Sequence, residues 1–90
     1  NEVWRDYLLK RLASAGVETT DSAGNFVLAR FGEDAETGVA AADAHLRRRG
    51  LIARRVDGYG LPGWLRITVG DEEACRRVAD AVAEFRAGAA

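Results

Sequence analysis

The hydrophobic positions of the chain follow two periods, and together they predict six elements of secondary structure. Apolar residues spaced three to four apart predict helices, whereas short apolar or alternating runs predict strands. The predicted helices are 1–15, 37–49 and 72–86, and the predicted strands are 25–31, 51–56 and 64–69. Gly16 and Gly50 stand where helices commonly end. The predicted order is therefore α-β-α-β-β-α.

The predicted connections favour one sheet topology. A helix joins the first two strands, whereas the glycine-rich loop 57–63 joins the last two. This pattern predicts an α/β (α+β) sandwich, with a three-stranded, mainly antiparallel sheet of order 1-3-2 and helices packed on one face. We expect Thr37 and Asp71 to cap the second and third helices, and 19–24 to form a polar turn.

The composition limits the number of domains and the classes of partner that the chain can have. The 90 residues, 48% of them hydrophobic, are enough for one domain, 1–90, with one modest core. A net charge of -1 argues against a dedicated nucleic-acid binder, and no apolar run approaches the length of a membrane span. A single cysteine, Cys75, fits the reducing cytoplasm. Because the chain starts at Asn1 without Met, we expect it to be a piece of a longer protein, produced either by design or by proteolysis.

The last predicted strand carries an arginine among apolar residues. Leu65 and Ile67 alternate with Arg66, so Arg66 should point away from the core. An unpaired buried charge is costly, and Arg66 must therefore reach water or an anion. Arg54 lies in the preceding predicted strand, and the two arginines could form a fork for carboxylate or phosphate. Ion pairs with acids of the same chain are the open alternative.

Other candidate residues carry weaker signals. The stretch 58–63 matches G-x-G-x-x-G, but a strand follows it where the dinucleotide fingerprint needs a helix. The glycines there are better explained by a tight loop or a close approach. Lys10, the only lysine, falls on the polar side of its helix, and we expect His45 at the surface and Cys75 in the core. No set of residues has metal-ligand spacing.

Three segments resemble a known family. They are N-F-V-L-A-R-F at 25–31, R-G-L-I-A-R at 49–54, and G-Y-G-L-P-G-W-L-R-I-T-V-G at 58–70 with D-E-E after it. In order and spacing they resemble the C-terminal part of histidinol-phosphate aminotransferases, which are pyridoxal-phosphate enzymes of the aspartate-aminotransferase fold type. The resemblance implies a small domain that packs on a large, cofactor-holding domain of the same enzyme.

The resemblance also implies roles for particular residues. The family's substrate-binding arginine in the L-R-I-T-V-G strand corresponds to Arg66, and the arginine that contributes to the substrate's phosphate corresponds to Arg54. The roles of Arg55 and Tyr59 stay open. The family's Schiff-base lysine and its cofactor-binding residues belong to the large domain. We therefore expect no catalytic, cofactor-binding or metal-binding residue in this chain, and no transamination by the chain alone.

The implied parent is a cytoplasmic, homodimeric histidinol-phosphate aminotransferase of histidine biosynthesis, acting by ping-pong amino transfer on an anionic small molecule. We expect no membrane or nucleic-acid partner. Three alternatives stay open at this point. They are an aromatic-amino-acid aminotransferase of the same family, a small ligand-sensing regulatory module, and a protein or RNA interaction domain that uses Arg47, Arg48, Arg49, Arg54 and Arg55.

Overall fold

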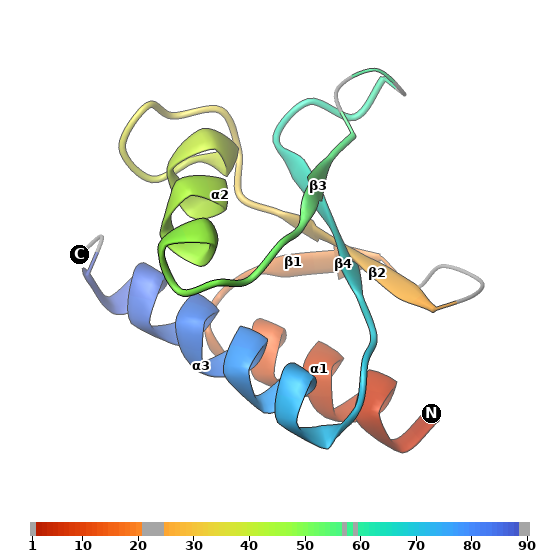
Figure 1. Ribbon diagram of the computed structural model, residues 1–90. Helices are drawn as coiled ribbons and strands as arrows, with labels where there is room; N and C mark the ends of the chain where they lie inside the picture. The colour runs from red at the N-terminus through yellow and green to blue at the C-terminus, as the bar shows by residue number, and fades with distance from the viewer. Residues whose placement is uncertain (1, 21–24, 57, 59, 89–90) are drawn as a thin grey trace.

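A computed structural model describes residues 2–20, 25–56, 58 and 60–88 of the chain. This part folds into three helices and a four-stranded antiparallel sheet of order β1-β2-β4-β3 (Figure 1). The elements are α1 (Glu2–Ser14), β1 (Glu18–Thr20), β2 (Phe26–Arg30), α2 (Val39–Arg48), β3 (Arg54–Arg55), β4 (Trp64–Thr68) and α3 (Glu72–Gly88). None of the helices in these ranges is both long and apolar enough to cross a bilayer.

The prediction of a three-stranded sheet was wrong, because the sheet has a fourth strand, β1. Its residue Thr20, which was expected in a turn, pairs with Leu28 on β2. The three polar residues of β1 lack the apolar alternation by which a strand is recognised in a sequence. They form a strand because they pair with the edge of β2. The three predicted strands keep their relative order, with β4 between β2 and β3. Residues 21–24 of the expected turn lie outside the described residues.

The second predicted strand, 51–56, is reduced to the two residues of β3. The reason is the way in which α2 ends. Gly50 has a φ of 75°, its N–H donates to Arg47 O, and the N–H of Leu51 donates to Leu46 O. These are the two hydrogen bonds of a Schellman motif, so the residues directly after Gly50 complete the helix end before the chain can pair.

The two predicted helix caps have different outcomes. Asp71 caps α3 as expected, because its Oδ1 accepts the N–H of Ala74 at 2.9 Å. Thr37 does not cap α2, whose N-cap is Gly38. Asp34 orders this turn instead by accepting the N–H groups of Glu36 and Thr37, and these hydrogen bonds lower the pKa of Asp34. A Cβ on Gly38 would lie 2.4 Å from Asp34 O, so a larger residue does not fit.

One hydrophobic core lies between the sheet and the helices. The inward residues of β2 and β4 join buried residues from all three helices in one cluster, so the helices cover a single face of the sheet (Figure 1). The largest fully buried side chains of this core are Leu8, Leu12, Leu46, Leu65, Ile67, Val27, Val82 and Cys75. Val78, which the sequence places on the apolar face of the last helix, is only partly buried beside this core.

Candidate functional site

Strand β4 determines where Arg66 points. Leu65 and Ile67 on either side of it are 0% and 2% exposed, and both belong to the core. Because successive side chains of a strand point to opposite faces, Arg66 lies on the face that the helices leave open. The orientation predicted for Arg66 is therefore confirmed, and its side chain is half-buried there. The strand is held on both sides, since Arg66 is directly opposite Leu28 on β2 and Arg54 on β3.

Arg54 and Arg66 share this open face. In an antiparallel pair, directly opposite residues have Cβ atoms about 5 Å apart on the same side of the sheet, and like charges in this position repel. No carboxylate among the described residues forms an ion pair with Arg54 or Arg66. Within the described ranges, the alternative of internal ion pairs therefore has no support. The described residues therefore leave these two positive charges without a neutralising acid, an arrangement that would attract an anion.

Phe26 lies beside Arg66 on the side away from Arg54. The guanidinium carbon of Arg66 is 5.2 Å from the centroid of the Phe26 ring, a cation–π contact. Phe26 is directly opposite Thr68, so its ring reaches Arg66 along the diagonal of the β2–β4 pair. The sequence analysis did not single out Phe26. The alternation of β2 shows that Phe26 shares a face with Leu28, but only the strand register shows that it reaches Arg66.

A hollow of about 380 Å³ adjoins the two arginines. Its lining comes from α2, the segment around β3, and β4, and consists of Asp43, Arg47, Ile52, Ala53, Arg54, Arg55, Val56 and Arg66. Four arginines thus face one carboxylate, and that of Asp43 already accepts from Arg47 Nε at 3.2 Å. Among the described lining residues positive charge exceeds negative charge, and the guanidinium groups of Arg54 and Arg66 suit an anion with several oxygen atoms.

A backbone contact fixes the start of β4. The carbonyl of Gly63 accepts the N–H groups of Phe31 and Gly32 at 2.8 and 3.0 Å. A Cβ on Gly63 would lie 3.1 Å from Gly32 Cα, so the loops after β2 and before β4 meet backbone to backbone. This close approach, which was one of the two explanations for the glycines, is three residues before Arg66. Asp57 and Tyr59 of the same loop lie outside the described residues.

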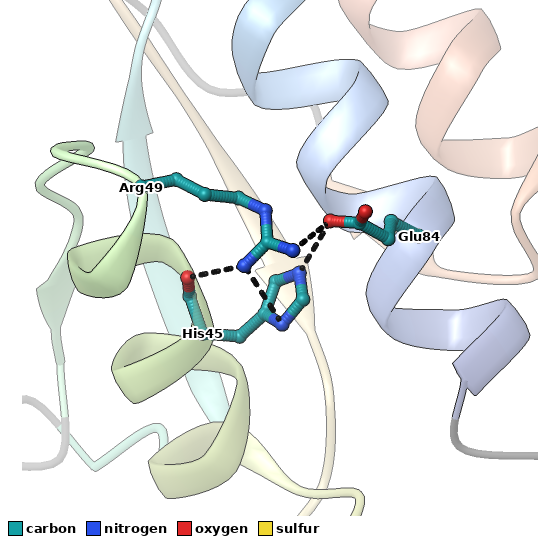
Figure 2. Close-up of polar contacts among 3 residues, drawn as sticks. All are labelled: His45, Arg49 and Glu84. Carbon is teal, nitrogen blue, oxygen red and sulfur yellow. Dashed lines mark hydrogen bonds and ion pairs between the residues drawn. The ribbon is translucent and has the colours of Figure 1, made fainter.

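His45 is not at the surface, contrary to expectation. Its side chain is 12% exposed and lies between α2 and α3, with Nε2 3.3 Å from Glu84 Oε1 (Figure 2). Its ring centroid is 5.4 Å from that of Phe85, and Arg49 also pairs with Glu84. Glu84 and Phe85 are far from His45 in sequence. The charged residues next to His45 in the sequence therefore did not reveal that these two side chains cover it. The cluster joins two helices on the side of the sheet away from Arg66.

The remaining candidates also lie away from the arginines. Lys10 is exposed on α1, and Cys75 is in the core as expected, where burial raises the pKa of its thiol. In the part of the chain that the structure describes, no group of three or more His, Cys, Asp or Glu side chains is arranged to hold a metal ion. The structure thus brings together Arg54 and Arg66, with Arg47 and Arg55 in the lining of the same hollow, and it places Lys10, His45 and Cys75 elsewhere.

Known proteins provide the context for this site. The family model of aminotransferase class I and II matches residues 4–82. A histidinol-phosphate aminotransferase of Ruegeria sp. (strain TM1040) is 53% identical over 90 residues, which is 100% of this chain and 24% of the relative. The enzyme of that name from Rhodospirillum rubrum is 44% identical over 88 residues, which is 98% of this chain and 24% of the relative. The chain thus spans about a quarter of the length of the curated relatives it matches.

Solved structures give the same picture. A protein of Erwinia carotovora atroseptica SCRI1043, provisionally named histidinol-phosphate aminotransferase, superimposes with a TM-score of 0.81 and 27% identity over 97% of this chain and 24% of its own. A provisionally named aminotransferase of Burkholderia pseudomallei K96243 gives a TM-score of 0.80 and 30% identity over 93% of this chain and 24% of its own. Sequence and fold agree, and the chain belongs to the class I and II aminotransferase family.

Proposed function

We propose that this chain is the C-terminal small domain of a histidinol-phosphate aminotransferase, and that Arg54 and Arg66 hold the anionic group of its substrate. The observation that carries the proposal is the placement of two arginines directly opposite each other on the open face of the sheet. No carboxylate of the described residues neutralises them. Relatives of that name match the whole chain at about half identity, which supports this enzyme over a ligand-sensing module or an RNA-binding domain.

The charge of the site favours a phosphate over a single carboxylate. A phosphate monoester carries a charge of about -1.5 to -2 at neutral pH, close to the two positive charges of Arg54 and Arg66. Its three terminal oxygen atoms can accept hydrogen bonds from both planar guanidinium groups at once, whereas a carboxylate offers only two oxygen atoms, both of which one bidentate arginine already contacts. Binding a phosphate monoester would therefore remove the repulsion between the two arginines.

In this proposal the chain does not hold pyridoxal phosphate. The cofactor, when bound, supplies the electron sink for amino transfer and is attached to a lysine. Lys10 is exposed on α1, and α1 packs on the face of the sheet opposite Arg66. We therefore place the cofactor in the large domain of the same polypeptide, and we take the full-length protein to be a cytoplasmic homodimer. In this proposal the small domain contributes substrate binding and orientation.

Substitution of the two arginines in the full-length enzyme tests the proposal. The ratio of kcat/KM for histidinol phosphate to kcat/KM for histidinol, which lacks the phosphate, isolates recognition of that group. Arg66→Lys keeps the charge but removes the planar fork, and should lower this ratio about 30-fold, equal to roughly 2 kcal/mol for a charged hydrogen bond. Arg54→Lys should act in the same direction.

Arg48→Lys is the matched control, because Arg48 is exposed on α2 and does not line the hollow. It should leave the ratio unchanged. The proposal would be contradicted if Arg66→Lys reduced kcat/KM equally for both substrates, because the residue would then support the fold or a common step rather than the phosphate.

A further inference from the structure

We propose that Phe26 is a positioning residue for Arg66, an inference that rests on the proposed function. The ring of Phe26 lies 5.2 Å from the guanidinium carbon of Arg66 and would hold this group where it meets the anion. The two residues come from neighbouring strands, and their contact is set by the register that pairs Phe26 with Thr68. Phe26 itself need not touch the substrate for this role.

The arrangement around Arg66 explains why positioning is needed. Arg54 lies directly across from it on β3, and its like charge pushes the guanidinium of Arg66 away. On the other side, β2 presents the negative face of an aromatic ring, which attracts the same guanidinium. Repulsion from β3 and attraction from β2 thus act in the same direction. Without the ring, a long side chain with several rotatable bonds would sample many positions.

The contact leaves the donors of Arg66 available. A cation–π contact uses the face of the aromatic ring and consumes no N–H hydrogen bond, and none of the described residues accepts a hydrogen bond from Arg66. A carboxylate partner would also fix the guanidinium, but it would neutralise the charge and occupy the donors. An aromatic ring therefore fixes an arginine without competing with the anion.

The property that matters in this account is the π face and not only the apolar volume. Leu28 is directly opposite Arg66 and already supplies an aliphatic neighbour, but it has no ring quadrupole. Phe26→Leu keeps an apolar residue in β2 and removes the ring, whereas Phe26→Tyr keeps both. The pair of variants separates positioning of Arg66 from a general contribution of residue 26 to folding.

The test uses the full-length enzyme with histidinol phosphate and with histidinol as substrates. We expect Phe26→Leu to raise KM for histidinol phosphate about fivefold, with a much smaller change for histidinol and little change in kcat, and Phe26→Tyr to stay within about twofold of wild type. Leu28→Val is the matched control on the same face and should behave as wild type. In an Arg66→Gln background, Phe26→Leu should have no further effect, because there is no cation left to position.

Two results would overturn the inference. One is an equal loss in Phe26→Leu and Phe26→Tyr, and the other is a loss in Phe26→Leu that persists in the Arg66→Gln background. If Arg66→Lys lowers the phosphate preference while Phe26→Leu leaves it intact, the positioning role fails and the proposed function stands. If Arg66→Lys leaves the preference intact, the proposed function fails, and the inference fails with it.

Discussion

Arg54 and Arg66 lie directly opposite each other on β3 and β4, so the open face of the sheet holds two like charges in one cross-strand pair. Such a pair destabilises a sheet unless something of opposite charge lies between its members. No carboxylate within the described ranges does so for these two arginines. As far as the described residues extend, Arg54 and Arg66 therefore form an unfavourable pair that an external anion would turn into a favourable one.

Removal of one of these charges should stabilise the isolated domain. We expect Arg54→Gln to raise the free energy of unfolding of the 90-residue chain by a few tenths of a kcal/mol, the lower part of the range for cross-strand pairs. The gain should shrink at high salt, because Arg54 is exposed and its charge is screened. Urea denaturation at low and high ionic strength measures both effects. A loss of stability in Arg54→Gln would mean that Arg54 makes a favourable structural contact.

The core should depend on Ile67 much more than on Val78. Ile67 is 2% exposed at the centre of the sheet, and Ile67→Ala should lower the free energy of unfolding by about 2–4 kcal/mol. Val78 is only partly buried, so Val78→Ala should cost less than half of that. Urea melts of the two variants give the comparison directly. Equal losses would show that the register of β4 or the orientation of α3 differs from the one described.

Cys75 should report unfolding through its thiol. It is 1% exposed, and burial raises the pKa of the Cys75 thiol, so the group should resist alkylation in the native state and react once the chain unfolds. Because the thiol has a higher pKa in the folded chain than in the unfolded chain, its protonated form favours the folded state. This contribution to stability is complete below the unfolded pKa and is lost as the pH rises toward the folded pKa. Cys75→Ala should show less alkaline loss of stability. Rapid labelling of native protein would contradict this placement.

The ion pairs between α2 and α3 should matter less than the packing around them. Glu84 accepts from Arg49 and lies 3.3 Å from His45 Nε2, but its side chain is 56% exposed (Figure 2). Glu84→Gln should therefore cost less than about 1 kcal/mol and less still at high salt. Phe85→Ala, which removes the ring that packs on His45, should cost several times more. Thermal melts of the two variants at two salt concentrations would distinguish them.

The sequence predicted the parts of this fold in which burial alternates clearly. Leu65 and Ile67 are buried and Arg66 is not, so period-2 alternation located β4 and the direction of its arginine. The ends of α1 and α2, shortly before Gly16 and Gly50, were equally predictable, because glycine favours the positive φ that both residues adopt. Both features depend on local sequence alone.

Features that depend on distant partners were not predictable. Strand β1 is polar and exists through pairing with β2, and the burial of His45 comes from Glu84 and Phe85 on another helix. The Phe26 contact requires the β2–β4 register, which no local pattern encodes. For Arg54 and Arg66, the predicted strands suggested a fork, the resemblance to a family implied their roles, and the structure supplies their direct opposition across β3 and β4.

The most direct test of the anion site is a crystal structure of the full-length enzyme with histidinol phosphate bound. Our account predicts that guanidinium nitrogens of both Arg54 and Arg66 lie about 2.7–2.9 Å from the phosphate oxygens, the spacing of charge-assisted hydrogen bonds. The account would be contradicted by a phosphate held by other residues, with Arg66 paired instead to a carboxylate of the large domain.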